Sequence, residues 1–573
     1  MSFLNKYIKI YWKKFLIALM FLTVEAVCDL LQPTIMSKII DYGVARKNMD
    51  YVLFMGMMML LVTAAGATGA VIRNIVSSRV SQSFGARLRG DLFKKIQSLS
   101  FDNLDDIEST TLITRLTSDI NQVQNFAHGM MRIFVKAPIL CVGSLIMAAM
   151  INPSMALVLL ALVPVIGSII FINLKVGYPF FMNIQKSLDK VNEVVREYLA
   201  GVRVVKAFNS FEYEMKRFKK ANDDLAKASI KGMRVMAVFF PIISISVNIG
   251  IILVLWLGAD RVNSGNMHVG QIIAFINYMT QILFSLIMLS HVFNMFIRAK
   301  ASAERIGEVF SQEPGLTYPI DAINPDNIRG KVEFDDVTFS YKGTEGEPVL
   351  KNISFVCNPG ETVGIIGSTA SGKTSLINLI PRFYDPNSGS VKVEDIDIKH
   401  MNLEALRKII ALVPQKVTLF SGTILENIRW GNETVSISEI EDAARAAQAH
   451  DFIMSFPKGY DTILGQGGVN LSGGQKQRIS IARALVRKPA ILLLDDCTSA
   501  LDMVTEVKLR AGIKDYLGNI TCFLVTQRIT AVMNADKIIV LDNGKISSIG
   551  NHEELMTSCD IYKDIYHSQI GRM

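Results

Sequence analysis

The stretch "GIIGSTASGKTSLINLI", residues 364–380, decides the fold of the second half of the chain. A β-rich apolar run precedes Gly367 and a helical run follows Thr374, so the pattern GxxxxGK[ST] lies between a strand and a helix. Backbone N–H groups of such a loop hold phosphates, Lys373 reaches the β- and γ-phosphates, and the Thr374 hydroxyl can ligate Mg²⁺. A chance glycine turn is the alternative, which this context disfavours. The expected phosphate-binding residues are Gly367, Ser368, Thr369, Ala370, Ser371, Gly372, Lys373, Thr374 and Ser375.

A second stretch of the same half, "ILLLDDCTSALD" at residues 491–502, runs from a buried strand into two aspartates. Asp495 directly follows four apolar residues, which is the position of a carboxylate that holds Mg²⁺, and Asp496 comes next. Strand-like and helix-like segments alternate from about residue 331 onward. We therefore predict a mostly parallel sheet covered by helices.

The composition places the first half of the chain in a membrane. Half of the 573 residues are apolar and 20% are charged, and the long uncharged runs fall before about residue 300. The net charge of +8 fits basic residues that flank membrane spans, and zinc-ligand patterns or a basic recognition helix that would indicate nucleic acid are missing. The cysteines stand far apart without a CxxC pair, so we expect free thiols in a reducing cell interior: Cys28, Cys141, Cys357, Cys497, Cys522 and Cys559.

Six apolar runs are each near the roughly 20 residues that a helix needs to cross a bilayer. The first run lacks a small-residue cleavage site and is therefore interpreted as a retained span, not a signal peptide. An even number of spans places both ends of the chain on one side. The predicted spans are Phe15 to about Ile40, Tyr51–Val76, Ile133–Met150, Met155–Leu174, Val235–Leu257 and Val269–Ile297.

Loop charges orient these spans. The connections 79–127 and 175–234 are basic, whereas the connection at Asn152, Pro153 and Ser154 has no charge, so both long connections and both termini are expected in the cytoplasm. The long connections keep helical periodicity, which predicts helices that continue far beyond the membrane. Prolines and polar residues mark a linker. The expected domains are a membrane domain at 1–310, a linker at 311–330 and a nucleotide-binding domain at 331–573.

Further motifs give a family resemblance. "LSGGQ" at residues 471–475, followed by "KQRISIARAL", resembles the signature of ATP-binding cassette (ABC) proteins. The other family motifs occur in the family's order: Tyr341 matches the aromatic residue that stacks on adenine, Gln415 matches the Q-loop residue near Mg²⁺, and Ser499 to Asp502 match the D-loop. With the six spans, the resemblance covers almost the whole chain and implies a half-size ABC exporter of the multidrug type. Its fold would be an α-helical membrane domain with six long transmembrane helices, followed by an α/β P-loop ABC-type ATPase domain that uses ATP and Mg²⁺.

The resemblance also implies roles outside the phosphate loop. ABC domains dimerise head to tail, so the signature of one chain completes the ATP site of its partner. In this chain the segments near Leu104 to Ile113 and Phe208 to Glu214 resemble the two coupling helices of such exporters. The residues implied to act on the partner's ATP are Ser472, Gly473, Gly474, Gln475 and Asp502.

Three positions depart from the family pattern. The residue after the strand aspartate is normally a glutamate that polarises the attacking water, and here it is Asp496. The switch segment normally has Val-Thr-His-Arg, and here "VTQR" places Gln527 at the histidine position, while Gln466 stands where a glutamate is usual. A carboxylate retracted by one methylene is misplaced by about 1 Å, which can cost on the order of a hundredfold in rate, and glutamine cannot carry the charge of an imidazolium. Asp495 is thus expected to hold Mg²⁺ and Asp496 to be a poor catalytic base.

A sound signature beside an impaired switch predicts a heterodimer. This chain would bind ATP at a slowly hydrolysing site of its own and complete a second site for a half-transporter with intact glutamate and histidine. The pattern resembles the degenerate, BmrC-like halves of heterodimeric bacterial multidrug exporters in the cell membrane. A homodimer with two slow sites is the alternative. A lipid or peptide flippase and a nucleotide-gated regulator that transports nothing are alternative functions on the same scaffold.

The substrate is less readable than the ATP site. Glu25 and Asp29 share a helix face, and Glu25 lies about 15 Å along the helix from Phe15, so a site for a cationic amphiphilic small molecule and a role in helix–helix contacts are equally favoured. His128, Arg132 and Lys136 form a basic stripe on the third span, which is more typical of a helix that enters the headgroup region than of a ligand site.

Overall fold

The computed structural model describes residues 3–313, 315–316, 321–325, 328–342 and 347–571. The chain divides into two compact units: a membrane domain, Met1–Gln97 with Ser109–Gln312, and an α/β domain, Ser98–Glu108 with Glu313–Met573. The predicted linker at 311–330 lies partly outside the described residues.

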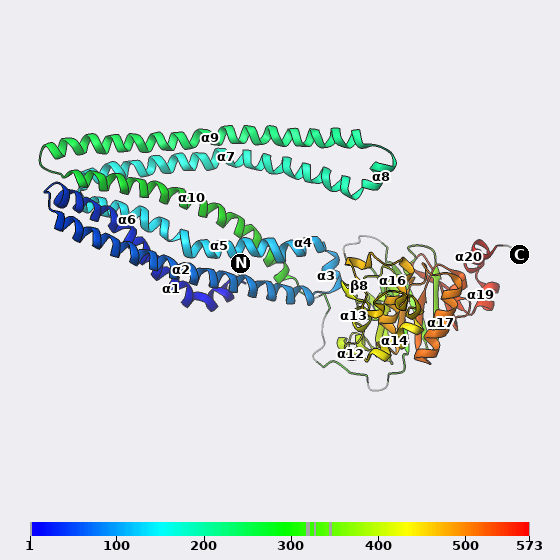
Figure 1. Ribbon diagram of the computed structural model, residues 1–573. Coiled ribbons are helices and arrows are strands. Elements are labelled where there is room, and N and C mark those ends of the chain that lie inside the picture. The colour runs from blue at the N-terminus through cyan, green and yellow to red at the C-terminus, as the bar shows by residue number, and fades with distance from the viewer. Residues whose placement is uncertain (1–2, 314, 317–320, 326–327, 343–346, 572–573) are drawn as a thin grey trace. The chain divides into compact units, whose positions relative to one another are not determined.

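The membrane domain is helical throughout (Figure 1). Long helices alternate with π-helical turns (η1–η3) and with shorter helices. Its elements are α1 (Leu4–Lys38), η1 (Ile39–Val44), α2 (Met49–Gln97), α4 (Ser109–Thr114), η2 (Arg115–Asp119), α5 (Ile120–Gly129), η3 (Met130–Phe134), α6 (Lys136–Ile151), α7 (Pro153–Ala200), α8 (Val202–Ala207), α9 (Phe211–Asn263) and α10 (Val269–Ser311).

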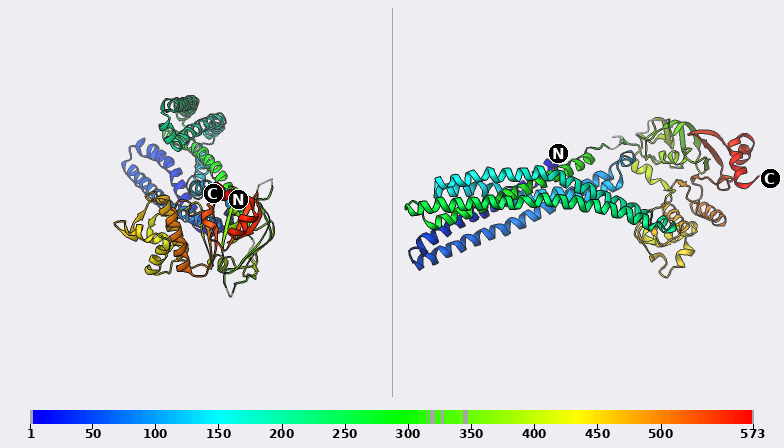
Figure 2. Two further views of the ribbon diagram at one scale, coloured as in Figure 1. Left: turned by 90° about the vertical axis from the view of Figure 1, so that its right-hand side faces the viewer. Right: turned by 90° about the horizontal axis from the view of Figure 1, so that it is seen from above.

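Six helical stretches are long and apolar enough to cross a membrane, which confirms the predicted number of spans. They extend well beyond the predicted apolar runs: α9, for example, has 53 residues, whereas a crossing needs about 20. α1 packs along α2, and α7 packs along α9. Figures 1 and 2 show the α7 and α9 helices side by side over most of their length.

Small residues and one tyrosine hold the helices of the membrane domain together. A Cβ atom on Gly66 would lie 2.9 Å from the Cys28 Cβ, and one on Gly69 would lie 3.2 Å from the Phe21 carbonyl oxygen, so α1 and α2 approach closely at these glycines. The fully buried Tyr278 of α10 donates its hydroxyl to the Leu30 carbonyl oxygen at 2.8 Å. α10 is thereby fixed to α1 through a polar contact inside an apolar cluster.

Buried charges join three helical segments near the start of the chain. The Glu25 carboxylate of α1 lies 2.6 Å from Lys136 Nζ of α6 and 3.0 Å from Arg73 Nη1 of α2, and its side chain is 10% exposed. Asp29 shares Lys136 at 2.9 Å, but its side chain is 34% exposed. Of the two sequence interpretations of Glu25, these ion pairs favour helix–helix contact over a free carboxylate for a cationic substrate.

We expect Glu25→Gln to lower the free energy of unfolding by about 3 kcal/mol, because removal of one partner leaves buried charges uncompensated. The variant should also lose transport of cationic and neutral probes to the same extent. Thermal unfolding in detergent and transport by vesicles measure the two effects. Asp29→Asn is the matched control, since it removes the more exposed partner of Lys136 and should cost less. A selective loss of cation transport by Glu25→Gln would contradict this expectation.

The α/β domain contains a six-stranded sheet of order β12-β11-β3-β10-β9-β6, parallel except for β12, and a four-stranded antiparallel sheet of order β2-β1-β4-β5. A short pair, β7-β8, completes the described strands. The strands are β1 (Val332–Phe339), β2 (Leu350–Cys357), β3 (Thr362–Gly367), β4 (Ser388–Val393), β5 (Ile396–Asp397), β6 (Ile410–Val413), β7 (Gly422–Thr423), β8 (Ile463–Leu464), β9 (Ile491–Asp495), β10 (Thr521–Val525), β11 (Lys537–Asp542) and β12 (Lys545–Gly550).

Helices cover the larger sheet, which confirms the predicted fold class of a six-helix membrane domain followed by an α/β domain. The helices are α3 (Phe101–Asp105), α11 (Lys373–Leu379), α12 (Leu403–Lys408), α13 (Ile424–Arg429), α14 (Ile437–Ala446), α15 (His450–Met454), α16 (Gly473–Leu485), α17 (Met503–Leu517), α18 (Ile529–Val532), α19 (His552–Ser558) and α20 (Asp560–Ile570), with 3₁₀ turns η4 (Gly459–Asp461) and η5 (Gln466–Gly468).

The central strands of the larger sheet are buried on both faces, as is usual for parallel strands between helices. Every residue of β9 is buried, and two apolar clusters lie on either side of the sheet. As predicted, all six cysteines are free. Cys357 and Cys497 are fully buried in these clusters, and burial raises the pKa of the Cys357 thiol to about 12.

The segment Ser98–Glu108 links α2 to α4 and packs within the α/β domain through α3. The Phe101 ring lies 4.6 Å from the Phe383 ring, and the Tyr384 hydroxyl donates to Asp105 Oδ2 at 2.7 Å. The resemblance placed the first coupling helix near 104–113; the structure begins α3 earlier, because Ser100 and Asn103 form a capping box. In the second such segment, α8 ends at Ala207 and Phe208 is 78% exposed.

Candidate functional site

The phosphate loop joins β3 to α11, as the sequence pattern predicted. Two glycines are required by the space around the loop. A Cβ on Gly367 would lie 2.1 Å from the Leu541 carbonyl oxygen. Gly372 has φ +98°, a left-handed conformation that favours glycine, and a Cβ there would lie 2.8 Å from Leu350 Cδ2. The loop thus opens α11 with its backbone N–H groups available to an anion.

Lys373, the first residue of α11, folds its side chain back over the loop. Its Nζ donates to the carbonyl oxygens of Gly367 (3.0 Å) and Ser368 (2.6 Å) and to Ser371 Oγ (3.3 Å). Burial lowers the pKa of Lys373, and the nearby Asp496 and Asp495 counteract this shift. The ammonium group therefore lies at the loop, where it can exchange carbonyl partners for phosphate oxygens.

Asp495 ends β9 beside the start of α11. The Thr374 hydroxyl donates to Asp495 Oδ1 at 3.1 Å, so the hydroxyl and the carboxylate expected at Mg²⁺ are in contact. Burial raises the pKa of Asp495, while the bond from Thr374 lowers it. A carboxylate that is destabilised in this way gains from a nearby cation.

Asp496 begins the turn after β9 in a left-handed conformation, with φ +44°. Its backbone N–H donates to the Val525 carbonyl oxygen at 2.8 Å, and its Oδ2 accepts a long bond of 3.4 Å from Gln415 Nε2. Burial raises the pKa of Asp496, whereas Gln415 and Arg528 lower it. β10 is the neighbour of β9 in the sheet. Gln527 comes two residues after the end of β10, and its side chain is exposed.

These residues line one cavity of about 390 Å³ at the carboxyl ends of β3, β9 and β10, which is where parallel sheets place their ligands. Tyr341 is not part of the lining, but its hydroxyl lies 2.9 Å from Ser375 Oγ at the rim. Gly367, which ends β3, and Ser368, the first residue of the loop, are not among the lining residues. The lining includes Thr369, Ala370, Ser371, Gly372, Lys373, Thr374, Ser375, Gln415, Asp495, Asp496 and Gln527.

The signature residues are not among the lining of this cavity. Ser472 caps α16: its Oγ accepts from the Gln475 N–H at 3.3 Å, and its N–H donates to Gln475 Oε1 at 2.9 Å. Ser472 and Gly473 are exposed, and Asp502 caps α17 by accepting from the Thr505 N–H at 2.9 Å. The predicted site residues therefore form two groups, one around the phosphate loop and one around the exposed start of α16.

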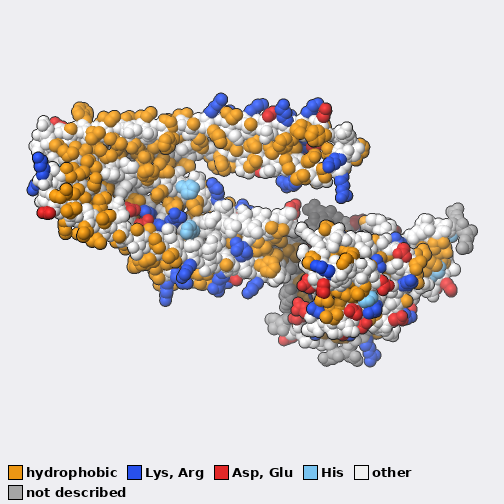
Figure 3. Space-filling view, viewed as in Figure 1, with side chains coloured by type: hydrophobic (Ala, Val, Ile, Leu, Met, Phe, Trp, Pro, Cys, Tyr) orange, Lys and Arg blue, Asp and Glu red, His pale blue; other side chains and the backbone are white. Residues whose placement is uncertain are grey.

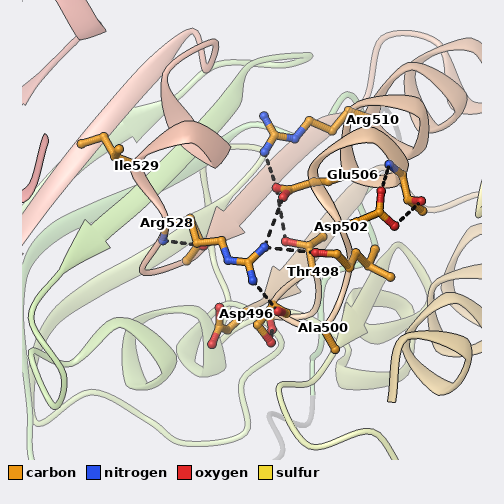
Figure 4. Close-up of polar contacts among 12 residues, drawn as sticks. Asp496, Thr498, Ala500, Asp502, Glu506, Arg510, Arg528 and Ile529 are labelled. Atoms are coloured by element: carbon orange, nitrogen blue, oxygen red, sulfur yellow. Dashed lines mark hydrogen bonds and ion pairs between the residues drawn. The ribbon is translucent and has the colours of Figure 1, made fainter. Parts of the chain in front are cut away.

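Arg528 contacts the turn that runs from Asp496 to Asp502, and its role was not predicted from the sequence. Its guanidinium donates to the Ser499 carbonyl oxygen (2.6 Å) and the Leu501 carbonyl oxygen (3.2 Å), and lies 3.9 Å from Glu506. Figure 4 shows Arg528 extending toward the turn that carries Asp496, Thr498 and Ala500. The only sequence signal was the arginine after Gln527 in "VTQR", because backbone carbonyl partners leave no trace in the sequence.

The donors of the cavity suit Mg²⁺. This ion prefers oxygen ligands and takes few of them from the protein beside a nucleotide's phosphates. Thr374 Oγ1 and Asp495 Oδ1 are already adjacent, and Gln415 offers an amide oxygen from the opposite wall. Within the described residues there is no cluster of three or more His, Cys, Asp or Glu side chains that would form a cage without phosphates.

Comparison with known proteins agrees with this arrangement. The chain matches the families described as ABC transporter transmembrane region, over residues 15–286, and ABC transporter, over residues 350–499. An uncharacterized ABC transporter ATP-binding protein of Bacillus subtilis, YfiB, is 42% identical over 97% of this chain and 96% of its own length. An ATP-dependent lipid A-core flippase of Thiobacillus denitrificans is 30% identical over 99% of this chain and 97% of its own length.

A solved structure shares the whole fold. The structure of a bacterial Atm1-family ABC exporter with ATP bound gives a TM-score of 0.81, with 24% identity, over 98% of this chain and 99% of that one. The six apolar helices, the phosphate-loop cavity and the extent of these matches agree. The chain therefore belongs to the ABC transporter family and is a half-size exporter, in which a multi-pass membrane domain is followed by one ATP-binding α/β domain.

Proposed function

We propose that this chain is one half of a heterodimeric exporter of amphiphilic small molecules and that its own ATP site hydrolyses slowly. The observation that carries the proposal is the pair of residues on the wall of the cavity. Asp496 and Gln527 line it at the positions where the family has a glutamate and a histidine. The position after β9 is thus occupied by an aspartate, whose side chain is one methylene shorter than that of glutamate.

The phosphate loop retains what ATP binding requires. Loop N–H groups and Lys373 bind the phosphates, with Lys373 leaving the carbonyl oxygens that it contacts without nucleotide. Thr374, Gln415 and Asp495 hold Mg²⁺, which neutralises charge on the phosphates. Tyr341 presents its ring to the adenine while its hydroxyl contacts Ser375. The site therefore retains the residues that bind ATP, although it activates the attacking water poorly.

Asp496 is less well placed to activate the attacking water than the glutamate usual in the family. Its carboxylate reaches Gln415 only through a 3.4 Å contact, and burial raises its pKa. What it lacks is reach, since reacting atoms must come within about 3–3.5 Å of one another. Gln527 can donate a hydrogen bond to phosphate but cannot supply a positive charge.

The intact signature supports a partner. Ser472, Gly473 and Gly474 are kept at the start of α16, outside the chain's own cavity. A sound signature is useful when it completes a site whose phosphate loop, glutamate and histidine belong to another half-transporter. A homodimer with two slow sites is the alternative arrangement.

The membrane domain carries the remaining part of the proposal. The basic connections around α3 and α8 support a cytoplasmic position in a bacterial cell for these connections, both termini and the α/β domain. A lipid flippase is the second candidate function, because one relative is a lipid A-core flippase.

The purified chain alone should bind ATP and hydrolyse it slowly, because every composite site would then use Asp496 and Gln527. Binding of a fluorescent ATP analogue and phosphate release measure the two properties separately. Lys373→Ala is the control that should lose binding as well. Rapid phosphate release by the chain alone, with no second half-transporter detectable by mass spectrometry, would contradict the proposal.

A further inference from the structure

A second cavity, of about 420 Å³, lies in the membrane domain between the segment α5–η3 and α10. Its wall includes several polar side chains: Gln122 and Asn125 come from α5, and Asn294 comes from α10. The predicted apolar runs begin at Ile133 and end at Ile297, so the cavity adjoins the ends of two membrane spans. It is therefore placed at the level of lipid headgroups and not in the centre of the bilayer.

Four basic side chains face this cavity. His128 and Arg132 are four residues apart, and His291 and Arg298 are seven residues apart, so each pair shares one face of a helical segment. The two faces meet because α10 packs against both α5 and η3. No carboxylate is among the described lining residues. Figure 3 shows histidine and basic side chains gathered on a membrane domain whose surface is otherwise largely apolar.

The basic side chains of this cavity lack partners in the part of the chain that the structure describes. Among the described residues, the side chains of Arg132 and Arg298 have neither a hydrogen bond nor an ion pair, and the buried His128 Nδ1 has no hydrogen-bond partner. By contrast, Arg73 and Lys136 of the same domain are both paired with Glu25. Two unpaired guanidinium groups on facing segments repel each other unless an anion lies between them.

We infer that this cavity binds the anionic head of an amphiphile, a phosphate or a carboxylate, with Arg132 and Arg298 as its principal ligands. The inference rests on the proposed export function and names the substrate class for it. Arginine suits the task because its planar fork donates two parallel hydrogen bonds to phosphate or carboxylate. The amide groups of Gln122, Asn125 and Asn294 supply further donors. The charge is opposite to that of the cationic substrate, which was one of the two interpretations of Glu25 from the sequence alone.

Lipid-facing arginines that extend to the headgroup region are the simpler explanation for basic residues at span ends. The cavity argues against it, because Arg132 and Arg298 line one shared space with His128 and His291 instead of separate outer faces. The volume is within the range of about 300–1,000 Å³ that small-ligand pockets occupy. It accommodates a head with part of its attached chain, and the apolar remainder stays in lipid.

Binding of fluorescently labelled phosphatidylglycerol to the purified transporter without nucleotide tests the inference. Phosphatidylcholine and a cationic lipid with the same label and chains are the comparison probes. We expect the anionic probe to bind at least tenfold more tightly than either, as charge-assisted hydrogen bonds would give. The double variant Arg132→Gln/Arg298→Gln should lose this preference, and Arg298→Lys should retain part of it.

Lys300→Gln is the matched control, since Lys300 is an exposed base on α10 outside the cavity lining. It should bind the anionic probe like the wild type. Equal affinity of the wild type for all three probes would overturn the inference, and this result does not depend on the folding of any variant. A soluble anionic dye without acyl chains, added as a competitor, distinguishes free organic anions from lipids as the source of the head. Displacement of the labelled phosphatidylglycerol would assign the site to free organic anions, and failure to displace it would assign the site to lipids. Both outcomes lie within the inferred class. ATP-dependent translocation in vesicles is read separately, so a probe that binds with the expected preference but is not moved refutes the export function alone.

Discussion

In the assembled pair, Ser472→Ala and Gly474→Asp are expected to abolish most ATPase activity and export, whereas Asp496→Asn changes steady-state turnover only a few fold. The signature donors would stabilise charge on the phosphate held by the partner, and loss of one such donor costs about 3 kcal/mol, or more than a hundredfold in rate. Asp496 lies at this chain's own site, which we propose is already slow. ATPase rates of the three variants, each with wild-type partner, measure the contrast.

Ser472 also caps α16, so its loss has a structural effect that must be subtracted. Ser436 is a matched control: it caps α14 through the same kind of capping box and accepts from the Glu439 N–H at 3.3 Å. Ser436→Ala should cost about 1 kcal/mol of stability and leave ATPase activity nearly unchanged. Gly474→Asp is the less specific change, because a Cβ there would lie 3.0 Å from the Ala500 carbonyl oxygen. If Asp496→Asn proved as harmful as Ser472→Ala, Asp496 would be an adequate base and the slow-site proposal would be wrong.

The double variant Asp496→Glu/Gln527→His is expected to accelerate ATP hydrolysis by the chain purified alone, on the order of a hundredfold. The added methylene extends the carboxylate from the turn after β9 toward the phosphates, and the imidazole restores a group that can carry a proton. The signature at the other face needs no repair, so both sites of a homodimer would gain. Phosphate release at saturating ATP measures the effect.

Asp496→Gln/Gln527→His is the control for this gain. Glutamine has the length of glutamate but no charge, so this variant should stay as slow as the wild type while it still binds ATP. Acceleration by both variants would mean that side-chain length, not basicity, limits the rate. Acceleration by neither would indicate that the site is slow for a reason outside positions 496 and 527.

The fold was predictable because its signals are local in the sequence. Apolar runs identified the spans, and the glycines around Lys373 with their flanking strand and helix identified the phosphate loop. Helix ends were less predictable. The predicted apolar run ends at Val76, whereas α2 continues to Gln97, because the helix extends past the apolar run as a helix with polar residues. Continuation itself was expected from the periodicity, but its end depends on the packing of neighbouring helices.

Pairings across long sequence separations were not predictable. Glu25 and Asp29 were recognised as costly carboxylates, but their partner Lys136 was assigned to a headgroup stripe, and Arg73 gave no signal. Which cation meets which carboxylate depends on how α1, α2 and α6 pack. The same limit applies to the second cavity, whose two basic faces lie about 160 residues apart in the chain and meet only through the packing of α10 on α5.

The buried thiols of the α/β domain make it suitable for site-directed chemical labelling. Cys357, Cys497 and Cys559 are buried, and burial raises the pKa of Cys522 to about 12. Maleimides and other thiol reagents attack exposed thiolates, so these native side chains present almost no target at neutral pH. A single cysteine introduced at the exposed Ser472 would then be the reactive position of the domain. Cross-linking from it to a second half-transporter can be followed without first removing the natural cysteines of this domain.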